Sequence, residues 1–150
     1  MINVDHGALP SAAVAIKKDL NMPNVLFGAL GSLVFLGLVI GSLFGTLMLG
    51  YFKFKPILAI SFLGNGIGLL MFVSFNNFYI MCFARFMSGF FQIFLTIYIP
   101  LYVDCFGNNS TKPCMLSLIL LAGPLGVVIG YGSTGAIIGY GYSWRFSFIV

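Results

Sequence analysis

Arg85 is the clearest residue in this sequence with the type and position to do chemistry in an apolar environment. It lies in an apolar run that starts at Phe78, which places it about 10 Å along a helix that rises 1.5 Å per residue. A charge at membrane depth costs about 2.5–3.5 kcal/mol on insertion scales, so it is a functional candidate by default. We interpret Arg85 as a coupling or gating charge, and a structural ion pair is the alternative.

Asp5 and His6 are adjacent near the start of the chain and form the second candidate. They would lie at membrane depth if the first helix were complete, and merely near a helix end if Met1 were the true start. We expect them to take part in a substrate or proton path. The alternative is that they are two ordinary residues near a terminus.

Enzymatic chemistry is disfavoured. The sequence has no nucleotide-binding, zinc-protease or serine-hydrolase motif, and its three acidic residues are all Asp, so paired-carboxylate catalysis is a poor fit. The three cysteines, Cys82, Cys105 and Cys114, lack metal-ligand spacing, and there is a single histidine. We expect no catalytic residue, no metal and no cofactor.

The elements that must position these residues follow from composition. The chain has 150 residues, of which 60% are hydrophobic and 7% charged, whereas a soluble domain carries about 25% charged residues. This excludes an ordinary soluble protein and a disordered chain. The net charge of +4 is scattered, so no nucleic-acid partner is expected. The sequence therefore predicts an all-α integral membrane protein that crosses the bilayer several times.

Long uncharged runs predict four complete spans, because a bilayer core needs about 20 apolar residues per helix. Short polar links between them predict antiparallel hairpins. Met1–Ile16 resembles the second half of a helix followed by a polar link at Lys17–Pro23, and another helix begins at Phe146. We thus expect one transmembrane domain over residues 1–150, truncated in its first and last helices. The four predicted spans are Asn24–Gly50, Pro56–Phe75, Phe78–Val103 and Cys114–Gly141.

Glycines at four-residue spacing predict close helix contacts, because small residues let helix backbones approach in lipid. The alternative is that these smooth faces let helices slide or rock, and Pro124 favours a kink. The residues concerned are Gly37, Gly41 and Gly45 in the first complete span, and Gly123, Pro124, Gly126 and Gly130 in the last.

Several groups of residues share a pattern with one known family: Val4-Asp5-His6-Gly7, Gly45–Lys55, Arg85-x-x-x-Gly89, Asp104-Cys105-Phe106, Gly123-Pro124-Leu125-Gly126, Gly130-Tyr131 and Trp144-Arg145. Together they resemble, over nearly the whole chain, the amino-terminal half of a major facilitator superfamily transporter of the spinster-like branch. The resemblance implies part of a six-helix repeat, with about four complete helices and truncated first and sixth helices.

The resemblance also implies a gating and loop signature at Gly45, Lys53, Lys55, Gly89 and Asp104. The signature's usual Asp falls on Leu49 here and its second Gly on Phe52, while Lys53 and Lys55 keep its basic character. The positive-inside rule does not decide the orientation, because three basic residues lie on each side of the membrane. The family topology would place Lys53, Lys55, Asp104 and Lys112 in the cytoplasm.

The function that follows is transport of a small solute by alternating access, in which one repeat rocks against another. The solute would move either alone or together with a coupled proton or another ion. The expected partners are the lipid bilayer, the solute, and a carboxy-terminal half or a second copy that completes the transporter. The alternative is a non-transporting small membrane subunit, or a truncated product, that packs against a larger membrane complex.

Overall fold

Four long apolar helices dominate the computed structural model, which describes residues 3–48, 54–108 and 110–149. Each of the four is long and apolar enough to cross a membrane, and the described residues contain no strand. The all-α membrane architecture predicted from composition is therefore confirmed. The helices are α3 (Asn24–Met48), α4 (Phe54–Ser74), α5 (Phe78–Phe106) and α6 (Lys112–Gly139).

The start of the chain forms two short helices in series, α1 (Val4–Ser11) and α2 (Ala13–Leu20). The Ala12 amide donates to the Ala8 carbonyl, and the Ile16 amide donates to the Ala12 carbonyl, each at 2.9 Å, so the hydrogen-bond ladder crosses the junction. The prediction that a polar link begins at Lys17 is wrong. Lys17 and Lys18 form the last helical turn, where cations are favoured, and Asn21 ends the helix in the left-handed conformation.

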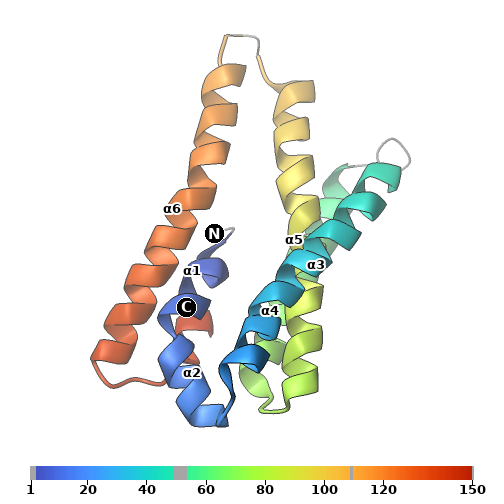
Figure 1. Cartoon of the computed structure of the whole chain (residues 1–150). Helices are drawn as coiled ribbons and strands as arrows, with labels where there is room; N and C mark the ends of the chain where they lie inside the picture. The colour runs from blue at the N-terminus through green and yellow to red at the C-terminus, as the bar shows by residue number, and fades with distance from the viewer. Residues whose placement is uncertain (1–2, 49–53, 109, 150) are drawn as a thin grey trace.

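The helices fall into two groups (Figure 1). The most extensive contacts join α3 and α4 to α5 in one group, and α1 to α6 in the other. The consecutive helices α5 and α6 contact each other little, although residues 107–111 connect them. The short helix α7 (Phe146–Ile149) contacts α4 as well as α6, so it links the two groups.

Glycines bring the helices of each group into backbone contact. A Cβ atom at Gly37 of α3 would overlap the Phe86 carbonyl of α5, and one at Gly89 of α5 would overlap the Val34 carbonyl of α3. The same reciprocal arrangement holds α1 on α6, where Gly7 meets the Val127 carbonyl and Gly130 meets the Val4 carbonyl. Each interface thus depends on a pair of glycines, one from each helix.

The other small residues predicted to pack differ in how closely they do so. A Cβ at Gly41 would lie 2.7 Å from the Phe90 carbonyl, and one at Gly123 would lie 3.3 Å from Asn3 Nδ2. Gly126 is buried in α6. The helix continues through Pro124, which is exposed.

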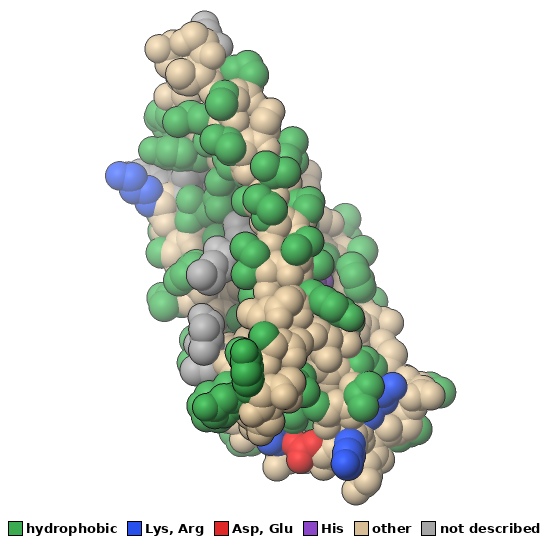
Figure 2. Space-filling view, turned by 90° about the vertical axis from the view of Figure 1, so that its left-hand side faces the viewer, with side chains coloured by type: hydrophobic (Ala, Val, Ile, Leu, Met, Phe, Trp, Pro, Cys, Tyr) green, Lys and Arg blue, Asp and Glu red, His purple; other side chains and the backbone are tan. Residues whose placement is uncertain are grey.

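The outer surface is apolar in its middle. Figure 2 views the molecule from the α6 side, where hydrophobic side chains are spread along most of the face, charged side chains of both signs gather at the lower end, and basic side-chain atoms also lie at the left edge of the upper half. Many large apolar side chains are exposed on the long helices, as expected for surfaces that face lipid rather than water. The chain is thus a multi-pass integral membrane protein.

The glycine contacts predict a position-specific loss of stability. Gly37→Ala should lower the free energy of unfolding in detergent by about 1–3 kcal/mol, because the methyl group has no room against α5. Gly28→Ala, in the same helix, is the matched control: a Cβ there meets no described atom within 4 Å, so the change should be neutral or stabilising by up to about 1 kcal/mol. Equal effects of the two changes on equilibrium unfolding would contradict the packing described here.

Candidate functional site

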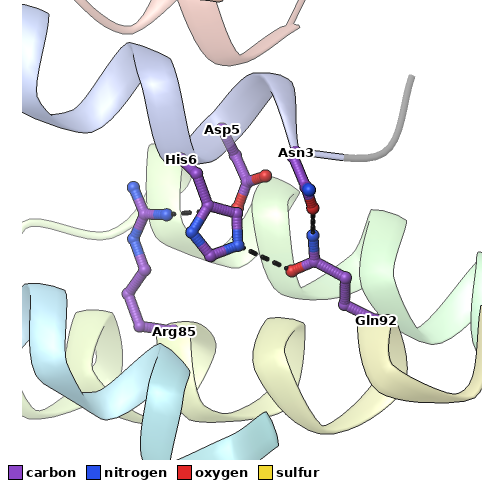
Figure 3. A network of polar contacts seen from close by, with 5 residues as sticks. All are labelled: Asn3, Asp5, His6, Arg85 and Gln92. Atoms are coloured by element: carbon purple, nitrogen blue, oxygen red, sulfur yellow. Dashed lines mark hydrogen bonds and ion pairs between the residues drawn. The ribbon is translucent and has the colours of Figure 1, made fainter. Parts of the chain in front are cut away.

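A buried ion pair joins the two helix groups. Arg85 of α5 is 1% exposed, and its Nη1 lies 3.5 Å from Oδ2 of Asp5 on α1, which is itself buried (Figure 3). Leaving either charge unpaired at this depth would be expensive, because burial removes most of its hydration and an opposite charge must compensate for that loss. The pair therefore fixes α1 against α5 at one level.

Aromatic rings complete the surroundings of the Arg85 guanidinium. Its Cζ lies 3.9 Å from the centroid of the Phe72 ring of α4 and 5.2 Å from that of Phe148 of α7. The negative faces of these rings attract the cation. Nε and Nη2 have no hydrogen-bond partner among the described residues, so Asp5 and the two rings carry the compensation of this charge.

A second polar connection lies beside the first. His6 Nε2 lies 2.9 Å from Gln92 Oε1, and the Gln92 amide donates to Asn3 Oδ1 (Figure 3). Because an amide oxygen only accepts, this geometry places the ring proton of His6 on Nε2. The α1 residues Asp5 and His6 thus contact α5 separately, at Arg85 and at Gln92.

A cavity of about 320 Å³ opens beside this network and lies between the two helix groups. One part of its wall can form hydrogen bonds and the other part is apolar, which suits a ligand that carries both kinds of surface. The polar lining residues are Asn3, His6, Gln92 and Thr96, and the apolar ones are Phe35, Leu38, Ile93 and Val127.

The structure brings the three ionisable candidates into one network and adds two residues that were not anticipated, Asn3 and Gln92. A signal for Gln92 was present in the sequence, since it follows Arg85 by seven residues, which is two helical turns on the same face. Asn3 lies at the start of the described chain, where periodicity gives no guidance.

The residues of the predicted gating signature take no part in the polar contacts of this network among the described residues. Gly89 contacts the α3 backbone, and Gly45 faces the Phe94 and Ile97 side chains of α5 at ordinary distances. Lys55 is exposed at the start of α4, whereas Lys53, Leu49 and Phe52 lie outside the described residues. Asp104 pairs with Lys112, with Oδ1 and Nζ 2.8 Å apart, at the exposed end of the α5–α6 hairpin.

Another polar cluster ties together three connections at the opposite end of the molecule. Arg145 Nη1 lies 3.0 Å from Asp19 Oδ2, and its Nη2 donates to Asn76 Oδ1 at 2.6 Å. The indole of Trp144 donates to the same Asp19 oxygen at 3.1 Å. The end of α2, the α4–α5 link and the turn before α7 therefore share one set of contacts.

The family model described as Major Facilitator Superfamily matches residues 3–150. A search of curated proteins gives no significant match.

The buried pair predicts a non-additive double-mutant cycle. Asp5→Asn and Arg85→Met should each lower the free energy of unfolding by about 3–5 kcal/mol, because each leaves one charge buried and uncompensated. The double variant should lose clearly less than the sum, since it leaves no unpaired charge.

Helix α5, which carries Arg85, also offers a matched control. Asp104→Asn breaks an exposed pair and should change stability by no more than about 1 kcal/mol. Equilibrium unfolding in detergent measures all four variants. Strict additivity of Asp5→Asn and Arg85→Met would show that the two side chains do not interact.

Proposed function

The chain belongs to the major facilitator superfamily, and from that premise we propose that it carries a small solute across the membrane by alternating access. Members of this superfamily are transporters built from helical repeats, in which one repeat rocks against another around a central site. The observation that carries the proposal is the cavity between the two helix groups, because its polar residues come from both groups.

In this proposal His6 and Gln92 contact the solute. Both side chains line the cavity, and His6 Nε2 forms a hydrogen bond of 2.9 Å with Gln92 Oε1. A solute with its own donors and acceptors can replace that hydrogen bond. Phe35, Leu38 and Ile93 supply the apolar part of the wall. Exchange of one hydrogen bond for another is nearly neutral in free energy, which favours a site that must release its ligand as well as bind it.

We assign the Arg85–Asp5 pair to coupling. A proton on Asp5 would remove the charge that compensates Arg85 and would weaken the link between α1 and α5. A change of protonation at one carboxylate would thereby alter how the two helix groups are held together. The coupled ion would be a proton in this scheme, and Arg85 would be the fixed charge that makes the helix position depend on it.

The transporter is completed, in this proposal, by a second six-helix unit, from a carboxy-terminal half or a second copy of the chain. The open cavity and the apolar faces of α3 and α6 support this assignment. We also propose the spinster-like branch, on the Asp5-His6 pair in the first helix and the Trp144-Arg145 pair before the last. Asp19 accepts from both Trp144 and Arg145, which gives that second pair a defined place.

Arg85→Ala should abolish transport while the protein remains in the membrane. Cells that express the protein and cells that express this variant can be compared by mass spectrometry of accumulated and exported solutes. We expect at least one solute class to change with the protein and not with Arg85→Ala. Normal transport by Arg85→Ala, at equal membrane levels of the two proteins, would contradict the coupling role of Arg85.

For a solute found in this way, Gln92→Leu should weaken binding about fivefold or more, because it removes a hydrogen-bonding group worth about 1–3 kcal/mol from the cavity wall. Thr96→Val is the matched control on the same wall. The Thr96 hydroxyl donates to the Gln92 carbonyl one turn away, so its loss should leave the apparent affinity nearly unchanged. An unchanged affinity in Gln92→Leu would remove Gln92 from the site.

A further inference from the structure

Three aromatic side chains lie against one another beside the buried Arg85, and we call them the ring cluster. Phe72 belongs to α4, Phe148 to α7, and Trp144 to the turn before α7. The ring centroids of Phe72 and Phe148 are 5.2 Å apart. The Trp144 centroid lies 6.0 Å from that of Phe72 and 6.1 Å from that of Phe148, and each pair meets edge to face. Because each ring contacts both others, a displacement of one requires a displacement of the rest.

The inner side of the ring cluster holds the Arg85 guanidinium. Its Cζ lies 3.9 Å from the centroid of Phe72 and 5.2 Å from that of Phe148. Nε and Nη2 have no hydrogen-bond partner among the described residues, so the rings and one 3.5 Å contact with Asp5 fix the position of the guanidinium. A shift of the rings would therefore change how Arg85 meets Asp5.

The outer side of the ring cluster is fixed by Asp19. The Trp144 indole donates to Asp19 Oδ2 at 3.1 Å, and Arg145 Nη1 lies 3.0 Å from the same oxygen. The Arg145 guanidinium also covers the indole, with Cζ 4.5 Å from the ring centroid. The Asp19 side chain is 44% exposed, whereas Trp144 is buried. A continuous run of packed side chains thus joins an exposed carboxylate to a buried charge.

A second route between the same two ends follows α1 and α2. Leu9 and Ile16 belong to the same buried apolar cluster as Phe72 and Trp144. A change at Asp5 could therefore reach the indole through the backbone of α1 as well as through the rings. An experiment on this connection must separate the two routes, because spatial continuity alone does not demonstrate coupling.

We propose that Trp144 is a positioning residue for Arg85. Asp19 orients the indole, and the indole holds the other two rings of the cluster against the guanidinium. The exposed Asp19 contact and the buried Asp5 contact are then coupled, so that a change at one alters the other. The meaning of this coupling for transport rests on the role proposed above for the Arg85–Asp5 pair, whereas the coupling itself can be measured without a solute.

Fluorescence of the single tryptophan tests this role, because Trp144 is the only tryptophan among the 150 residues and is 4% exposed. In the full chain in detergent, Asp5→Asn should shift the emission to longer wavelength, since an uncompensated Arg85 loosens the rings and lets water approach the indole. Asp104→Asn breaks an exposed ion pair and should leave the emission unchanged. Circular dichroism must show that each variant keeps its helices. Asp5→Glu, which keeps the charge but moves the carboxylate, replaces Asp5→Asn if that variant unfolds and should give a smaller shift.

Substitutions in the ring cluster separate the two routes. Phe72→Leu removes the ring that contacts both Arg85 and Trp144, and in this background Asp5→Asn should no longer shift the emission. Phe148→Leu is the second variant, used also where Phe72→Leu does not fold, and should clearly reduce the shift. Phe78→Leu is the matched control: Phe78 packs against the same apolar cluster, so the shift should remain.

Two outcomes would overturn the proposal. One is an unchanged emission in folded Asp5→Asn, which would show that the two ends are independent. The other is a full shift in both the Phe72→Leu and the Phe148→Leu backgrounds, which would show that α1 carries the change. A chain that shows the expected shifts but moves no solute would keep the positioning role of Trp144 and lose the transport function, so the two proposals fail separately.

Discussion

The charge of Arg85 is the constraint on which the arrangement of this chain depends. A guanidinium that is 1% exposed inside an apolar bundle needs an anion beside it, and the chain has three acidic residues. Asp19 and Asp104 pair with Arg145 and Lys112 at the two ends of the molecule, and Asp5 pairs with Arg85. The position of α1 follows from this pairing, and with it the position of His6.

Backbone contact at glycines makes the rest of the arrangement possible. Gly7 and Gly130 hold α1 directly on the α6 backbone, so the opposite side of α1 is left to carry Asp5 and His6 toward α5. Gly37 and Gly89 do the same for α3 and α5, which keeps Arg85 and Gln92 at a fixed depth. Between the groups, the polar contacts lie beside an apolar cluster in which Leu9 and Ile16 pack with Phe72 and other buried residues of the first group, and the cavity opens next to the polar contacts.

Much of the fold could be predicted because hydropathy and length alone define a membrane span. The end of α2 could not be predicted in this way, because the sequence at Lys17 and Lys18 is typical of a polar link, whereas these residues form the last turn of a helix. In the site, Arg85, Asp5 and His6 stood out by charge. Gln92 and Asn3 did not, because an uncharged amide becomes notable only when its partner, 89 residues distant in sequence, is known. The Asp19–Arg145–Asn76 cluster was missed because its members are distant in sequence, with Asn76 lying 69 residues before Arg145.

The α1–α2 segment is held to the rest of the molecule at two points. Asp5 is fixed to α5 near one end of the segment, and Asp19 is fixed to Arg145 near the other, about 21 Å away at helical rise. The segment cannot rotate about one of these contacts while the other ion pair is intact. Under the proposed alternating access, the seven described helices would therefore turn together, and the movement would take place where they meet a second unit.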